Sequence, residues 1–375
     1  MKAVLCGYGV VGKGVEILCA NLNSISIEHV FVRKEKEKKP YFTNELDVVC
    51  KPEIDIVFEC LNGLEPAHTL VTKALQAGKH VITSNKALIA TYLNTYLEIC
   101  KETNATIQIE ACVAGGIPFL DALLKLQRLE PILGYEGIFN GTSNYILDQM
   151  QKNNMSYQDA LQQAKDKGYA EFDSTNDTEG IDVWYKAKIA NALSYQIPLI
   201  EITAPIGISK ITEKDIEFAK KHHAVIRHIA LSSFQDQKLA CIIAPAFYPQ
   251  DHFLANVPEN YNAQFIYAHS FSKLGYFGQG AGQLATAQAM VQNALDCIDH
   301  CIRLIHCEKQ EIQSWHQHFD WIVRTKLSLK HIASQSLEQD FYLIKNQPLS
   351  AVQSIVENDK QAMIALWRIS YVENH

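Results

Sequence analysis

The chain has 375 residues, of which 47% are hydrophobic and 20% are charged, and its formal net charge of −7 comes from acidic and basic residues mixed along the sequence. This length predicts two domains with room for a small third module. The charge excludes a nucleic-acid or anionic-membrane surface, which would need a concentrated basic patch, and no apolar run approaches the roughly 20 residues of a membrane span.

Short apolar strands alternate with helical patterns in the first third of the chain. The expected strands are at residues 1–9, 27–33, 54–62, 80–85 and 106–113. The expected helices between them are at residues 10–22, 66–79 and 86–104. This alternation predicts a parallel sheet with crossover helices. The strands are almost continuously apolar, which indicates that helices cover both faces of the sheet.

A second pattern follows, with helices first and strands later. We expect helices or strand–helix units at 115–127, 132–150, 156–168 and 179–190, strands at 225–231, 239–245 and 264–267, and a glycine-rich turn followed by a long helix within 275–305. We therefore predict an α/β chain with a dinucleotide-binding domain (1–112), an α+β catalytic and dimerisation domain (113–290) and a small C-terminal module (310–375). The helix near 283–305 is expected to pack back on the first domain.

The stretch "CGYGVVG" places Gly7, Gly9 and Gly12 between a strand and a helix. This is the context that the G-x-G-x-x-G dinucleotide fingerprint requires. The glycines allow a tight turn, close approach to a pyrophosphate and close helix packing, and the helix N-terminus, with Val10 and Val11, favours phosphate. The alternative is a tight strand–helix turn that binds no ligand.

The end of the second strand predicts which cofactor binds. An acidic residue there would bond the ribose 2′-hydroxyl of NAD, whereas this chain has Arg33 and Lys34 at that place. Cations suit the 2′-phosphate of NADP, so we predict NADP(H) in preference to NAD(H). The alternative is that the side chains of Lys34–Lys39 simply point to water.

Several collinear stretches resemble the homoserine dehydrogenase family, from residue 1 to about 290. They are "GYGVVGKGV", "IDIVFECLNGLEPA", "GKHVITSNKAL", "EACVAGGIP", "NGTSNYIL", "GYAEFDSTNDTEGIDVWYKAKI" and "GQGAG". Departures from the family pattern are "FDS" at Phe172–Ser174, Ala285 where a proline is usual, and a tail shorter than the regulatory ACT domain of many members.

The resemblance implies reversible reduction of aspartate 4-semialdehyde to homoserine by NAD(P)H, in threonine and methionine biosynthesis. Asp182 and Lys186 share one helical face, and their spacing alone favours an ordinary ion pair. The resemblance instead implies that Lys186 transfers the proton and that Asp182 orients it, with Lys86 as a second cation near the reacting carbonyl. A surface lysine at a helix start is the alternative for Lys86.

The resemblance also implies the substrate and ligand contacts. Glu171 and Asp177, with Tyr169, would bind the substrate ammonium, and Gly141 and Thr142 would hold its carboxylate unless they only cap a helix. The implied additional cofactor contacts are Ser84, Lys86 and Gly280. A structural Na⁺ or K⁺ would be held by Glu110, Val113, Gly115 and Ile117.

Two other functions stay open at this point. Cys112 could be the nucleophile of a phosphorylating semialdehyde dehydrogenase, although no obvious base is near it in sequence, and the chain could be a catalytically silent nucleotide-binding paralogue. Zinc at Cys297–Cys307 is disfavoured because that stretch reads as a helix packing small apolar residues. The histidines of "KHHAVIRH" are interpreted as ordinary polar residues of the surface and of a strand, not as a metal site.

The remaining expectations concern the setting of the protein. The ten cysteines are scattered, many of them in apolar runs, which is typical of free thiols in a reducing compartment. Together with the absence of a visible targeting segment, this predicts a cytoplasmic protein. The family resemblance implies a homodimer that pairs through the second domain.

Overall fold

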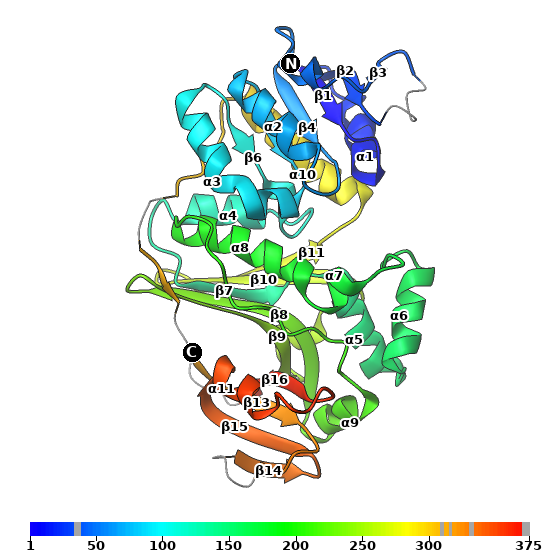
Figure 1. Cartoon of the computed structure of the whole chain (residues 1–375), viewed down its shortest axis with the longest axis vertical. Helices are drawn as coiled ribbons and strands as arrows, with labels where there is room; N and C mark the ends of the chain where they lie inside the picture. Colours follow the sequence, from blue (N-terminus) through cyan, green and yellow to red (C-terminus); the bar gives the residue numbers. More distant parts are fainter. Residues whose placement is uncertain (34–38, 308–310, 315–316, 330–333, 370–375) are drawn as a thin grey trace. The chain divides into compact units, whose positions relative to one another are not determined.

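The computed structural model describes residues 1–33, 39–307, 311–314, 317–329 and 334–369 (Figure 1). The chain forms two compact units. The first contains Met1–Ile132, Lys188–Glu201 and Gly278–Gln310, and the second contains Leu133–Ala187, Ile202–Phe277 and Glu311–His375. Among the described residues, no helix has the length and apolar character needed to cross a bilayer.

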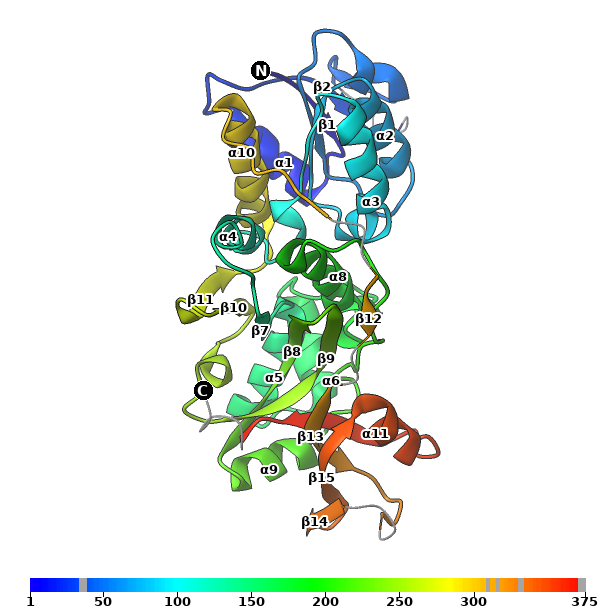
Figure 2. The ribbon, with the colours of Figure 1, turned by 90° about the vertical axis from the view of Figure 1, so that its left-hand side faces the viewer.

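The first unit is built on a six-stranded parallel sheet with the order β3-β2-β1-β4-β5-β6. The strands are β1 (Lys2–Cys6), β2 (Ser26–Phe31), β3 (Phe42–Thr43), β4 (Ile56–Glu59), β5 (His80–Thr83) and β6 (Ile107–Gln108). Figure 2 shows α1 (Val10–Cys19) and α10 (Gln283–Ile298) on one face, and α2 (Ala67–Gln76) and α3 (Lys86–Glu102) on the other. This Rossmann-type arrangement confirms the predicted parallel sheet with crossover helices and explains its apolar strands.

Two short helical segments follow β6 in the first unit. They are the 3₁₀ turn η3 (Glu110–Cys112) and helix α4 (Phe119–Leu126); an earlier 3₁₀ turn, η2 (Leu46–Cys50), precedes β4. Helix α10 packs along α1, and a Cβ atom at Gly14 would lie 2.7 Å from the Gln283 carbonyl oxygen. Only glycine allows these two helices to approach so closely.

The second unit is built on a ten-stranded mixed sheet with the order β11-β10-β7-β8-β9-β16-β13-β15-β14, and β12 also pairs with β9. The strands are β7 (Gly134–Ile138), β8 (Ala224–Gln235), β9 (Lys238–Pro249), β10 (Tyr261–Ala268), β11 (Ser272–Gln279), β12 (Gln313–Ser314), β13 (His318–Arg324), β14 (Ser334–Glu338), β15 (Phe341–Pro348) and β16 (Met363–Trp367).

The helices of this unit are α5 (Gly141–Asn153), α6 (Tyr157–Asp166), α7 (Thr175–Thr178), α9 (Glu213–Lys221) and α11 (Leu349–Ile355), with a 3₁₀ turn η4 (Phe253–Asn256). Helix α8 (Ile181–Tyr195) begins in the second unit, and its last residues belong to the first. Two apolar clusters form the core. Successive residues of β13 contribute to opposite clusters, Trp321 and Val323 to one and Ile322 to the other, as the two-residue period of a strand dictates.

The C-terminal segment is hydrogen-bonded into the same sheet. Strand β16 runs parallel to β9, with Leu366 opposite Ala246, and antiparallel to β13. Just after β16, the Arg368 guanidinium lies 3.3 Å from the carboxylate of Glu136 in β7. Burial disfavours ionisation of Glu136, but Arg368 and hydrogen bonds from Tyr248 and Tyr267 outweigh it and hold the pKa of Glu136 below its usual value.

The sequence-based prediction missed several elements and extended one too far. Strand β11 was interpreted as part of a glycine-rich turn, because its exposed position removes the apolar alternation that signals a strand. Helix α10 was expected to continue to residue 305, yet it ends at Ile298, and His300 adopts a positive φ of 54° that a helix cannot continue through. Helix α9 and the short α7 were also not predicted.

Candidate active site

A buried lysine–aspartate pair lies on α8. The Lys186 ammonium donates to Asp182 Oδ2 at 2.7 Å and to the Phe139 carbonyl oxygen at 2.6 Å. Asp182 is 5% exposed and Lys186 7%. The helical spacing predicts such a pair, but a surface ion pair of that kind contributes little, whereas here both charges are removed from water. Burying them costs free energy, which makes the pair a candidate for function.

The strand–helix junction at β7 and α5 meets this pair. Asn140 caps α5, with its side-chain oxygen accepting from the Ser143 N–H at 2.8 Å. Its amide nitrogen donates to Asp177 at 2.7 Å and to Asp182 at 2.9 Å. The structure therefore brings two of the predicted acidic residues to one amide group.

The other predicted substrate contacts of this unit differ in their surroundings. Thr142 is buried and donates its hydroxyl to the Tyr169 carbonyl oxygen at 2.6 Å, and the Tyr169 ring lies edge-on to Tyr145. Gly141 lies tightly against the chain at Asn260, where a Cβ would be 2.5 Å from the carbonyl oxygen. Glu171 is exposed in the loop before α7, so its carboxylate is accessible to a ligand.

Sequence reasoning missed two buried polar residues near this pair. Asn140 was not singled out although it begins the motif "NGTSNY", in which its capping position was the available signal. His228 is interpreted from the sequence as an ordinary polar residue on the surface or in a strand. It does lie in a strand, β8, but its side chain is fully buried. Burial lowers its pKa to about 4, against smaller opposite effects of the hydrogen bond with the Ile206 carbonyl oxygen and of the Asp182 charge.

The glycine loop of the first unit has the geometry of a phosphate-binding turn. Gly7 has a φ of +100°, and a Cβ there would lie 2.8 Å from the Cys60 carbonyl oxygen. A Cβ at Gly12 would lie 2.1 Å from the Gly7 carbonyl oxygen, whereas one at Gly9 would meet nothing within 4 Å. Gly9 precedes the exposed Val10 at the N-terminus of α1. The open space at Gly9 and the free helix N-terminus fit a pyrophosphate.

Cationic and aromatic side chains lie close to this loop. Arg33, at the end of β2, is exposed, while the predicted Lys34 lies outside the described residues. Tyr8, inside the loop, and Tyr41 both donate to the Glu16 carboxylate, and the Lys39 ammonium donates to both phenol oxygens, at 3.1 and 2.8 Å. This network was not predicted, because its members are separated in sequence.

A buried carboxylate contacts the end of β5, just before Ser84 and Lys86. Glu59, at the end of β4, accepts from the Thr83 hydroxyl at 2.5 Å and from the Leu61 N–H at 2.8 Å. Its backbone oxygen accepts from the Ser84 N–H at 3.3 Å. Lys86 is the first residue of α3 and is half-buried. The side chain of Asn85 caps this helix. Burial raises the pKa of Glu59 from 4.5 to about 7.

This pKa predicts a pH-dependent stability. Between pH 4.5 and 7 the folded chain holds a proton on Glu59 that the unfolded chain has lost, so the free energy of unfolding falls as pH rises through that window. The loss is at most about 3 kcal/mol. We expect Glu59→Gln to remove this dependence and to be more stable than the unsubstituted chain at pH 8. Urea unfolding at pH 5 and pH 8 measures both quantities; parallel curves for the two proteins would contradict the prediction.

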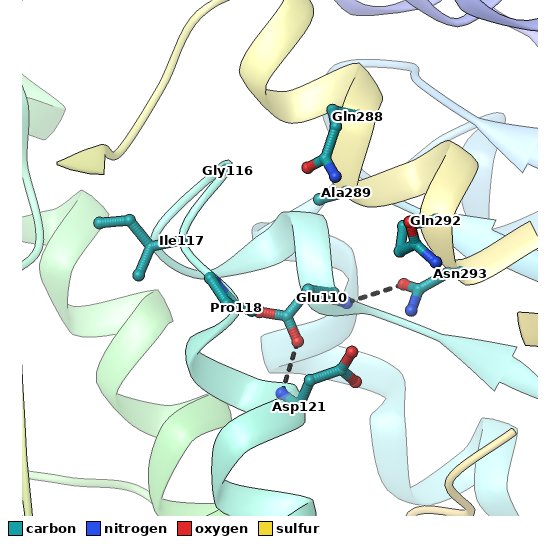
Figure 3. Close-up of a pocket in the computed structure, with 9 residues that line it drawn as sticks. All are labelled: Glu110, Gly116, Ile117, Pro118, Asp121, Gln288, Ala289, Gln292 and Asn293. Atoms are coloured by element: carbon teal, nitrogen blue, oxygen red, sulfur yellow. Dashed lines mark hydrogen bonds between the residues drawn. The ribbon is translucent and has the colours of Figure 1, made fainter. Parts of the chain in front are cut away.

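Two of the four residues proposed for a cation, Glu110 and Ile117, line a small pocket in the first unit, drawn in Figure 3, whereas Val113 and Gly115 are not among its lining residues. The pocket has a volume of about 90 Å³ and is lined by Glu110, Gly116, Ile117, Pro118, Asp121, Gln288, Ala289, Gln292 and Asn293. The Glu110 carboxylate accepts from the N–H groups of Leu120 at 3.1 Å and Asp121 at 2.6 Å. Burial, with a smaller effect of the Asp121 charge, raises the pKa of Glu110 well above its usual value.

This arrangement fits a monovalent cation, because a positive ion would offset that unfavourable charge. The fit is partial for the carbonyl donors. The Ile117 oxygen already accepts from the Phe119 N–H at 2.7 Å. Gly115 packs against Gly280, where a Cβ would lie 2.5 Å from the Gly280 carbonyl oxygen.

The cysteines do not form a catalytic or metal centre in the part of the chain that the structure describes. Cys112 is buried and donates to the Thr83 carbonyl oxygen at 3.3 Å, and burial raises its pKa well above the usual value. A nucleophilic thiol needs the opposite environment. Within the described residues no group of three or more His, Cys, Asp or Glu could hold a metal ion. The stretch Cys297–Cys307 is helical only as far as Ile298, so the expected helix was wrong there.

Two family models match most of the chain. Residues 7–110 match the family model "Homoserine dehydrogenase, NAD binding domain", and residues 118–295 match "Homoserine dehydrogenase". The homoserine dehydrogenase of Pseudomonas aeruginosa is 34% identical over 313 residues, which cover 80% of this chain and 72% of that protein. That of Bacillus subtilis is 33% identical and covers 78% and 72%.

Solved structures give the same result over nearly the whole chain. The homoserine dehydrogenase of Thiobacillus denitrificans superposes with a TM-score of 0.86 at 27% identity, and that of S. aureus with 0.78 at 27%; each match covers 98% of both chains. A hyperthermophilic archaeal homoserine dehydrogenase solved with NADPH shares the fold, with a TM-score of 0.68 at 23% identity.

The dinucleotide loop and these matches define an NAD(P)-dependent oxidoreductase that acts on a CH–OH group. Within that class, the chain belongs to the homoserine dehydrogenase family. The resemblance found in the sequence motifs is thus confirmed. The family reaction requires a hydride donor, a proton donor for the developing alkoxide, and groups that hold an amino acid.

Proposed function

We propose that the second unit handles the proton and the substrate while the first binds the cofactor. The observation that carries this proposal is the buried contact of Lys186 with Asp182, next to the Asn140 amide that also holds Asp177. A buried ammonium held by a carboxylate can donate its proton as an alkoxide forms and recover it in the reverse reaction. Asp182 keeps the Lys186 ammonium in place.

We assign the remaining residues by the groups that the substrate presents. Glu171 and Asp177 bind the substrate ammonium, with Tyr169 beside them, and Gly141 and Thr142 bind its carboxylate through N–H and hydroxyl groups. Lys86 is the second cation near the reacting carbonyl. The bound nicotinamide supplies the hydride, so the protein's task is positioning and proton transfer.

Turnover of the purified chain tests the reaction. With homoserine and either NADP or NAD, we expect absorbance of the reduced cofactor to rise, and we expect thiol alkylation to leave the rate unchanged. No turnover with either cofactor would contradict the proposed reaction. Because Cys112 is buried, the variant Cys112→Ser tests it directly, and loss of activity in that variant would instead favour the phosphorylating semialdehyde dehydrogenase.

We propose that NADP(H) is preferred over NAD(H), bound by Gly7, Gly9, Val10, Val11, Gly12, Ser84, Lys86 and Gly280 with Arg33 and Lys34 at the 2′-phosphate. Arg33 supports this because it is exposed at the end of β2. A charge-assisted hydrogen bond contributes about 1.5–3 kcal/mol, so Arg33→Ala should raise the KM for NADP about 10-fold and leave that for NAD unchanged. Arg128→Ala, exposed just beyond α4, is the control. Equal changes for both cofactors would contradict the preference.

We further propose a structural Na⁺ or K⁺ bound by Glu110, Val113, Gly115 and Ile117. The buried Glu110 carboxylate supports it. We also propose that the domains are 1–112 with helix α10 (Gln283–Ile298), 113–290, and a C-terminal module at 310–375 whose strands join the sheet of the second domain. The protein is expected to be cytoplasmic and to serve threonine and methionine biosynthesis.

We propose a homodimer that pairs through the second unit. In that unit β11 ends the described sheet; Phe277 on β11 and Phe253 in η4 contact each other edge to face, and each is 50% exposed. Phe277 stacks on Tyr261 with ring centroids 5.1 Å apart. An exposed aromatic cluster at a sheet edge suits a second copy. Sedimentation velocity should show a dimer that Phe277→Asp dissociates and Leu129→Asp, at an exposed site of the first unit, does not.

A further inference from the structure

The junction between β7 and α5 is fixed from several sides. The Gln264 side chain donates to the Ile138 carbonyl oxygen at 2.8 Å, and Lys186 donates to the next carbonyl, that of Phe139, at 2.6 Å. The residue that follows is Asn140, which is 4% exposed. Two successive carbonyl groups are thus held by side chains from β10 and α8, so the position of Asn140 is strongly determined.

The side chain of Asn140 has only one orientation that suits its neighbours. Its oxygen accepts from the Ser143 N–H, and its nitrogen donates both hydrogens, to the carboxylates of Asp177 and Asp182. If the amide were turned over, its oxygen would face two carboxylates and its nitrogen would face an N–H donor. The three partners therefore select the orientation.

We propose that Asn140 is a positioning residue that couples substrate binding to proton transfer, an inference that rests on the proposed roles of Asp177, Asp182 and Lys186. One amide sets the separation of the two carboxylates and offsets their repulsion. Asp182 Oδ2 accepts from both Asn140 and Lys186, at 2.9 and 2.7 Å. The ammonium-binding carboxylate and the proton-handling pair are consequently held in one hydrogen-bonded chain.

Two substitutions separate this role from simple helix capping. Serine and aspartate both cap helices about as well as asparagine, but serine has no amide hydrogens for the carboxylates, and aspartate adds a third negative charge. For Asn140→Ser we expect a kcat about 100-fold lower, the scale of a small misplacement of reacting groups, and a raised KM for homoserine. Asn140→Asp should be slower still. A capping role alone predicts that both variants resemble the unsubstituted chain.

A double-mutant cycle supplies the second measurement. If Asn140 acts by holding the carboxylates, then Asn140→Ser should lower kcat much less in an Asp182→Asn background than alone, because coupled residues are not additive. Ser156→Ala, which removes the side-chain cap of α6 in the same unit, is the control for loss of a cap and should leave kcat unchanged. Thermal unfolding checks that each variant is folded.

The inference is overturned if Asn140→Ser keeps kcat and KM within about threefold, or if its effect adds fully to that of Asp182→Asn. Should Asn140→Asp fail to fold, the serine variant and the cycle still decide. If Lys186→Met also keeps its activity, the proposed catalytic roles fail with it. A damaged Lys186→Met beside an unaffected Asn140→Ser would sink the inference on Asn140 alone.

Discussion

Lys186→Met is expected to lower kcat about 1,000-fold, within the range that a positioned general acid contributes. The methionine retains an unbranched side chain of similar length and loses the ammonium that contacts Asp182 and the Phe139 carbonyl oxygen. Because the proton donor acts on the developing alkoxide, the KM for the cofactor should change little. Steady-state rates in both directions, with the cofactor saturating, measure the effect.

Lys188 on the same helix offers a matched control. It is also 7% exposed and pairs with Glu201 at 2.7 Å. Lys188→Met therefore removes a buried ammonium of the same kind without touching the proposed proton donor, and kcat should stay within a few-fold of the original value. If Lys186→Met behaves as Lys188→Met does, the proton-transfer role belongs to another residue, with Lys86 the next candidate.

The second large effect is expected in the glycine loop, where Gly12→Ala and Gly9→Ala should differ. A Cβ at position 12 would lie 2.1 Å from a backbone oxygen, so the loop must distort. We expect Gly12→Ala to lower the free energy of unfolding by about 3 kcal/mol, the upper part of the range for overpacking, and to abolish cofactor binding. At Gly9 a Cβ meets no protein atom within 4 Å, so stability should be retained.

For Gly9→Ala only cofactor binding should suffer, because the added methyl occupies the space that a pyrophosphate would approach. Urea unfolding without cofactor gives the stabilities, and fluorescence titration with reduced NADP gives the affinities. A Gly9→Ala chain that binds the cofactor normally would show that the pyrophosphate does not approach the loop there. A Gly12→Ala chain of unchanged stability would contradict the packing argument.

The elements of the first unit were largely predictable, because each has a strong local sequence pattern and the patterns of neighbouring elements point to the same fold. The strand, glycine loop and helix at residues 2–19 and the pairs that follow them have the apolar runs and periods that a covered parallel sheet demands. The second unit was harder. Its edge strand β11 is half exposed, and helix α9 contains many charged residues, so tertiary contacts rather than local pattern define them.

The residues of the candidate site also include some that the sequence predicts and some that it does not. Lys186 and Asp182 were predicted because helical spacing and the family motif coincide on α8. Asn140 and His228 could not be predicted as neighbours of this pair, since they come from the β7–α5 junction and from β8, and only the fold brings them near α8. The burial of Lys186 and Asp182 could not be predicted either, because a surface ion pair and a buried one have the same spacing in the sequence.

The shared sheet has a practical meaning for anyone shortening this chain. Cutting near residue 310 would not release an independent appendage, because β16 pairs with β9 and Arg368 neutralises Glu136 in the strand that leads to Asn140. The truncated protein would carry an open β-edge, a template for aggregation, and an uncompensated buried charge. Insolubility of such a fragment would therefore reflect lost sheet partners and would say nothing about a regulatory role for the removed residues.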